Sequence, residues 1–112
     1  MNDLNIGMMM FYLLAAHALA DYPLQGDYLA QAKNRHTKLG ANGIWVHALF
    51  SHSLIHAAFV AYITGVWCIG LCELVAHAAI DFMKCENKID YHGDQILHIV
   101  LKFIWAVWAT RL

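Results

Sequence analysis

The stretch 43-GIWVHALFSHSLIHAAFVAYI-63 is apolar along most of its length and contains no Asp, Glu, Lys or Arg. Three further apolar-rich runs cover about residues 6–21, 66–84 and 94–110. Hydrophobic residues make up 61% of the 112 residues, against roughly 45–50% in soluble domains. A small soluble domain cannot hide so much apolar surface. The sequence therefore predicts one all-α domain over residues 1–112, a membrane bundle of four transmembrane helices in up-down topology.

Breaks between the runs set the expected helix ends. Pro23 should end or kink the first helix, and residues 24–33 should form a short amphipathic continuation. The Thr64-Gly65 pair permits a tight turn, although an unbroken helix across it stays open as an alternative. Either Gly93 or Asp94 could cap the last helix, because a carboxylate suits the positive end of a helix.

The basic residues indicate an orientation. They collect in and beside two polar loops, over residues 34–42 and 85–93: Lys33, Arg35, Lys38, Lys84 and Lys88. The positive-inside rule predicts that both loops face the cytoplasm of a bacterial inner membrane and that both termini lie outside, with Arg111 as a mild counter-signal. Ala18-Leu19-Ala20 resembles a signal-peptidase site, but no Lys or Arg precedes it, so we expect a retained first helix. The net charge of −1 gives no reason to expect nucleic-acid binding.

Polar pairs spaced four residues apart occur in all four runs: His17 with Asp21, His52 with His56, His77 with Asp81, and Asp94 with His98. Four residues advance a helix by about 400°, so the members of each pair share one face. All four pairs fall in the half of the bundle predicted to be cytoplasmic. Because an ionisable side chain in hydrocarbon costs a few kcal/mol, such residues normally face inward and are paired or functional.

This pattern predicts a metal site formed by those eight residues. Imidazole nitrogens and carboxylate oxygens suit Zn, Mn or Fe, and helical bundles hold one or two such ions between facing helices. One of Asp21, Asp81 and Asp94 would act as general base if it is not a ligand. A structural interpretation stays open, in which Asp21 caps its helix and Asp81 pairs with Lys84. His52 could instead orient another ligand.

Four nearby polar residues are candidates for substrate binding: Gln25, Lys33, Lys84 and Gln95. The amides could orient a water molecule or bind a phosphate oxygen, and the lysines could attract anionic headgroups. Simple anchoring by the two lysines is the alternative.

The remaining histidines and the cysteines are weaker candidates. His47 lies on the opposite side of its helix from His56, and His36 and His92 fall in predicted loops. The odd number of cysteines argues against a disulfide framework. Cys68 and Cys72 share a helix face, where packing is the better interpretation than metal binding.

The ordered motifs His17-x-x-x-Asp21-x-x-x-Gln25, His52-x-x-x-His56, His77-x-x-x-Asp81-x-x-Lys84 and Asp94-Gln95-x-x-His98, with Lys33 between the first two, resemble a family of small bacterial and phage membrane proteins catalogued as a domain of unknown function. That family is distantly similar to membrane-bound, metal-dependent hydrolases of the LexA-regulated type. The resemblance implies membrane helices and a His/Asp site. It also implies a hydrolytic activity, but it does not specify the substrate. The added His47, and the lack of a cytoplasmic extension found in longer relatives, would fit a short form from a phage.

Three functional hypotheses follow. The first is a membrane-embedded metal-dependent hydrolase acting on a phosphoester or a lipid-linked molecule from the cytoplasmic leaflet, with the lipid bilayer as partner and a homo-oligomer as an open possibility. The second is a metal-ion or proton transporter, although the outer half of the bundle offers few polar stations for a path. The third is a non-catalytic phage effector that binds a host protein.

Overall fold

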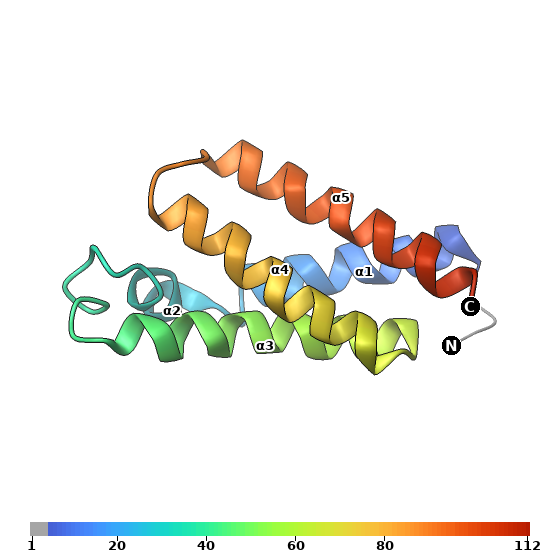
Figure 1. Cartoon of the computed structure of the whole chain (residues 1–112), viewed down its shortest axis with the longest axis horizontal. Coiled ribbons are helices and arrows are strands. Elements are labelled where there is room, and N and C mark those ends of the chain that lie inside the picture. The colour runs from blue at the N-terminus through green and yellow to red at the C-terminus, as the bar shows by residue number, and fades with distance from the viewer. Residues whose placement is uncertain (1–4) are drawn as a thin grey trace.

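The computed structural model of the protein describes residues 5–112, and this part of the chain is all-helical. The helices are α1 (Ile6–Asp21), α2 (Gly26–Ala32), α3 (Ile44–Thr64), α4 (Trp67–Cys85) and α5 (Tyr91–Thr110). The four long helices, α1, α3, α4 and α5, pack into an elongated body of 46 × 22 × 22 Å, and the short α2 packs against α3. The start of α1, the α3–α4 turn and the end of α5 gather at one end of the molecule, and the α2–α3 and α4–α5 loops lie toward the other (Figure 1).

The all-helical expectation is confirmed, but the prediction of four transmembrane helices is wrong. Within residues 5–112, α3 alone is both long and apolar enough to cross a membrane. The apolar α1 has only 16 residues. The α4 and α5 helices are long enough, but charged side chains dilute their apolar character: Glu73, Asp81 and Lys84 in α4, and Asp94 and Lys102 in α5. The predicted orientation of the termini presupposes those spans and stays a prediction.

The apolar surplus noted in the composition lies largely on the outer surface. Large apolar side chains are exposed on each of the long helices, for example Phe11 (66%), Tyr62 (70%) and Val75 (71%). The high apolar content of the sequence therefore corresponds to an apolar outer surface. That this surface contacts a lipid bilayer stays a prediction.

Local sequence signals explain where the helices begin and end. The α1 helix stops two residues before Pro23, and α2 follows after a short turn. Gly65 ends α3 with a φ of 73°, which Gly adopts without the steric penalty of a side chain, so the predicted turn at Thr64-Gly65 is confirmed. The predicted cap of α5 is wrong, because α5 already begins at Tyr91. The Asp90 side chain caps it by accepting a 2.7 Å hydrogen bond from the Gly93 amide.

The interior has an apolar part and a polar part. The apolar part is a cluster of six buried residues near the end that carries the α3–α4 turn: Met9, Leu13, Val60, Ile69, Trp105 and Ala106. Here α3 and α4 approach closely at Gly70, where an added Cβ would lie 2.7 Å from the Ala61 Cβ. The polar part, toward the loop end, holds the histidines and aspartates identified in the sequence.

Ion pairs hold the α2–α3 loop against the end of α4. The Arg35 guanidinium donates two hydrogen bonds to Glu86, of 2.6 and 2.8 Å, and the His36 ring lies 2.8 Å from the same carboxylate. The hydrogen bonds from Arg35 lower the pKa of Glu86 to about 2. This contact fixes the segment that follows Lys33, which enters the polar interior.

Candidate metal centre

The polar pairs converge on one buried region between α1, α3, α4 and α5. One set of ligand atoms, from Asp21, His52, His56 and His77, lies within a mutual separation of 4.8 Å, and a second set, from Asp81, Asp94 and His98, meets the same limit. The three histidines of α3 and α4 in the first set are almost fully buried. Helical periodicity produces this convergence, because each pair occupies the inward face of its own helix.

Several nitrogen–oxygen distances in this cluster match the geometry of a shared metal ion better than that of a hydrogen bond. His52 Nε2 lies 3.3 Å from Asp21 Oδ1 and 3.4 Å from Asp81 Oδ2. His98 Nε2 lies 3.3 Å from an oxygen of Asp81 and 3.3 Å from Asp94 Oδ1. Ligand atoms about 2.0–2.1 Å from a tetrahedral ion are themselves about 3.3–3.4 Å apart. The cluster is therefore spaced like a set of metal ligands.

Unpartnered buried atoms support the same interpretation. Among the described residues, eight buried side-chain atoms have no hydrogen-bond partner, and three of them are His52 Nε2, His77 Nε2 and Asp94 Oδ1. An unsatisfied buried polar atom costs about 1–3 kcal/mol, so such atoms in a native site call for a specific explanation. All three belong to the converging sets, and a bound cation would satisfy them together.

A second buried network of hydrogen bonds contacts His77 at Nδ1, the ring nitrogen that faces away from the cluster. Glu73 Oε2 lies 3.0 Å from His77 Nδ1, so the Nδ1–H would donate and the other ring nitrogen would face the cluster. Both Glu73 oxygens also accept from Lys102 Nζ, at 3.0 and 3.1 Å, and Oε1 accepts a 2.8 Å hydrogen bond from the Trp105 indole. Glu73, Lys102 and Trp105 were not among the site residues predicted from the sequence. The four-residue spacing of Glu73 and His77 was the available signal.

Gln95 ties the two ligand sets together. Its side-chain nitrogen donates to Asp21 Oδ2 at 3.2 Å and to Asp94 Oδ2 at 3.0 Å. The Gln95 Oε1 lies 3.1 Å from His17 Nε2. His17 Nε2 also lies 3.2 Å from Asp21 Oδ2. His17 therefore borders the cluster beside Asp21, without belonging to either set of converging ligand atoms.

The other predicted substrate residues fall in different places. Lys33 is buried, with 5% of its surface exposed, and its ammonium group donates a 2.7 Å hydrogen bond to Asp81 Oδ2. The Gln25 amide instead donates to the backbone oxygen of Asp21. Lys84 lies over the Tyr91 ring, 5.5 Å from its centre, rather than in the cluster. The suggested Asp81–Lys84 pair is thus replaced by Asp81–Lys33.

The cluster also shifts the pKa values of its members. Burial raises the pKa of Asp21, but the nearby imidazoles of His17, His52 and His56 outweigh it and hold the pKa well below the usual range. Burial lowers the pKa of His56 to about 3, despite its 2.8 Å contact with Asp21. Burial likewise acts to lower the pKa of His98, but contacts with Asp81 and Asp94 raise it to about 9. His56 is therefore neutral and donates its Nε2–H to Asp21, whereas a metal ion at His98 must displace a proton.

The weaker candidates lie outside the cluster. His36, His47 and His92 are exposed, and His92 lies in the first turn of α5 rather than in a loop. Cys68 and Cys72 are free and exposed on α4, and Cys85 is free and buried.

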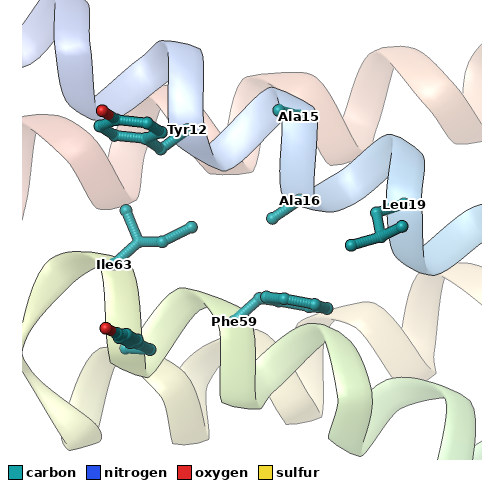
Figure 2. A pocket seen from close by; sticks show the side chains of 7 residues that line it. Tyr12, Ala15, Ala16, Leu19, Phe59 and Ile63 are labelled. Carbon is teal, nitrogen blue, oxygen red and sulfur yellow. The ribbon is translucent and has the colours of Figure 1, made fainter.

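An apolar groove runs along the surface between α1 and α3. It has a volume of about 370 Å³, and Figure 2 shows Tyr12, Ala16 and Leu19 of α1 facing Phe59 and Ile63 of α3 across it. A second hollow continues it past Phe59 and Tyr62 to Leu24 and Ile55. Leu19 and Leu24 flank Asp21 in the chain. The groove therefore lies along α1 and α3, the helices that carry Asp21, His52 and His56 of the first ligand set.

Comparison with known families gives one match over nearly the whole chain: residues 9–112 match the model of DUF3307, described as a protein of unknown function. Comparison with curated proteins and with solved structures gives no match.

Proposed function

The chain belongs to the DUF3307 family, and we propose that it is a metal-dependent hydrolase whose His/Asp cluster binds a divalent transition metal, Zn, Mn or Fe. The observation that carries the proposal is the buried convergence of His and Asp ligand atoms, several pairs of which lie 3.3–3.5 Å apart, a spacing suited to a shared ion. A distant relation of the sequence motifs to LexA-regulated metal-dependent hydrolases is part of this proposal.

A bound divalent ion would act as a Lewis acid and would lower the pKa of a coordinated water toward neutrality. The protein side chains would supply the rest of the chemistry. Asp21 is the most accessible of the three aspartates, with 12% of its side chain exposed against 3% for Asp81 and 2% for Asp94. Asp21, a member of the first ligand set, is therefore the best placed of the three to hold the ion where substrate or solvent can reach it.

The surroundings of the cluster favour an anionic substrate, a phosphoester or a lipid-linked molecule. The buried Lys33 ammonium group lies beside Asp81 and could donate to a phosphate oxygen. The apolar groove between α1 and α3 could hold the hydrocarbon part of such a molecule. Lys84 lies over the Tyr91 ring, and its role in substrate binding stays a prediction.

The test combines metal analysis with a hydrolysis assay on phosphorylated lipids and nucleotides. We expect stoichiometric metal in the purified protein or after loading with Zn or Mn, and hydrolysis that a chelator abolishes. Asp21→Asn should lower kcat by at least about 10–100-fold, because the ion loses a charged ligand and even the loss of a residue that only supports a ligand has an effect of that size. Asp27→Asn is the matched control, because Asp27 is exposed on α2. Absence of bound metal after loading would refute the proposal.

The metal-ion or proton transporter and the phage effector remain predictions, because no feature of the described residues favours either.

A further inference from the structure

We infer that the cluster is a two-metal centre in which Asp81 bridges the two ions. The inference rests on the proposed metal binding and specifies how the ligands divide. One ion would be held by Asp21, His52, His56 and His77 of α1, α3 and α4, and the other by Asp94 and His98 of α5. Asp81 of α4 would contribute one oxygen to each.

The two oxygens of Asp81 face different histidines. Oδ2 lies 3.4 Å from His52 Nε2 and 3.5 Å from His77 Nε2, both in the first set, and it accepts one hydrogen bond, of 2.7 Å, from Lys33 Nζ, which leaves a lone pair for an ion. Oδ1 lies 3.3 Å from His98 Nε2, in the second set. A carboxylate placed between two groups of nitrogen ligands in this way has the arrangement of a bridge, as in the carboxylate di-metal centres of helical bundles.

The number of ligands also exceeds the need of one ion. The first set alone supplies four ligand atoms, as many as a tetrahedral ion takes, and the oxygen of Asp81 would make that ion five-coordinate. Asp94 and His98 would then have no ion to bind, although Asp94 Oδ1 is buried without a partner and His98 is fully buried. A second ion that shares Asp81 gives these groups a function.

A different assignment of the ligands, in which Glu73 binds an ion together with His77 and His98, must also be considered. Its carboxylate lies close enough to His77 and His98 to form a third possible set. However, its oxygens already accept hydrogen bonds from Lys102 and Trp105, and it contacts His77 Nδ1. Glu73 therefore positions His77 instead of binding an ion, which leaves His77 Nε2 to the first set and His98 to the second.

Charge balance points the same way. Glu73 is neutralised by Lys102, whereas the three carboxylates of Asp21, Asp81 and Asp94 face one ammonium group, that of Lys33, and the imidazole of His98. Buried carboxylates of like charge repel one another unless cations accompany them. Two divalent ions would compensate these groups and leave a net positive site, which suits a phosphoester substrate.

The experiment uses the full chain loaded with Mn²⁺, with elemental analysis and electron paramagnetic resonance as readouts. We expect two Mn per chain and a spectrum of exchange-coupled ions. His52→Ala and His98→Ala should each leave one ion with the spectrum of an isolated Mn²⁺, and Asp81→Asn should abolish the coupling. His47→Ala is the matched control on α3, because His47 is exposed, and it should retain both ions and the coupling.

Circular dichroism would verify that each variant is folded, and His98→Gln serves if His98→Ala is not. One ion per wild-type chain, or two ions whose spectrum does not depend on Asp81, would overturn the two-metal inference. Hydrolysis supported by one ion would contradict this inference and leave the proposed function standing. Two coupled ions without hydrolysis of any substrate tested would contradict the proposed function and leave the two-metal centre standing.

Discussion

His77 illustrates how the fold prepares one side chain for a metal ion. Its Nδ1 faces Glu73 at 3.0 Å, and its Nε2 faces Asp81 without a hydrogen-bond partner. Burial raises the pKa of Glu73, but the contacts with His77 and Lys102 outweigh it and lower that pKa to about 2. The carboxylate is thus ionised throughout the neutral range and holds the imidazole in one orientation, as carboxylates commonly do behind metal-bound histidines.

This arrangement predicts the effect of removing the carboxylate. Glu73→Leu combined with Lys102→Met removes both charges of the pair, so no unpaired ion stays buried. We expect the affinity for Zn²⁺ to fall about 10–100-fold, measured by competition with a chelator, because His77 loses its support. Glu73→Gln with Lys102→Met keeps an oxygen that accepts from His77 Nδ1 and should recover most of the affinity. Equal affinities in the two double variants would show that Glu73 does not position His77.

At the scale of the elements, the crossing of α3 and α4 places two of the polar pairs opposite each other. These helices make the most extensive contact in the described chain, and a glycine permits their closest approach. A Cβ at position 70 would lie 2.7 Å from Ala61 Cβ and 2.9 Å from the Ala57 carbonyl oxygen. Close packing here brings His52 and His56 of α3 within reach of His77 on α4, whose ring centre lies 3.8 Å from that of His56.

Gly70→Ala should therefore force α3 and α4 apart. We expect the free energy of unfolding to drop by about 1–3 kcal/mol, the usual cost of overpacking a well-packed interface, measured by chemical denaturation. Gly7→Ala is the control, because its added Cβ would meet only Asn5 Oδ1 at 3.4 Å and alanine favours the helix. A Gly70→Ala protein as stable as the wild type would mean that the interface has room the structure does not show.

At the scale of the whole molecule, the polar cluster joins all four long helices. Its ligands come from α1, α3, α4 and α5, so no pair of helices forms the site alone. The apolar half of the interior is small, with six residues in its buried cluster. A cation shared by helices distant in sequence would therefore stabilise the whole fold and not only one segment.

Metal binding should consequently raise global stability. Free Zn²⁺ at 100 times its Kd should increase the free energy of unfolding by about 2.7 kcal/mol, provided the unfolded chain binds none. Thermal unfolding with Zn²⁺ and with a chelator measures the difference. His47→Ala should show the same shift as the wild type, and His77→Ala with Asp81→Ala should show none. A shift that survives in the double variant would place the bound metal elsewhere.

The sequence by itself determined local features, namely where the helices begin and end and which residues share a helix face. Helix periodicity and the breaks at Pro23 and Gly65 predicted the long helices closely, because caps, turns and faces depend on neighbours within a few residues. The four-residue spacing likewise identified the polar pairs that the structure brings together, because each pair shares a face whatever the packing. That these residues bind metal stays a prediction.

The tertiary structure decided everything that depends on contacts between helices. It directed Lys33 to Asp81 and Lys84 to Tyr91, although both lysines looked alike in the sequence. It assembled Glu73 with Lys102 and Trp105, residues about thirty positions apart, which no local pattern connects. It also corrected the four-span prediction, because the charged groups that build the buried network reduce the apolar character of α4 and α5. A helix face can be predicted from its own residues, but its partner is chosen by packing between segments that are distant in the chain.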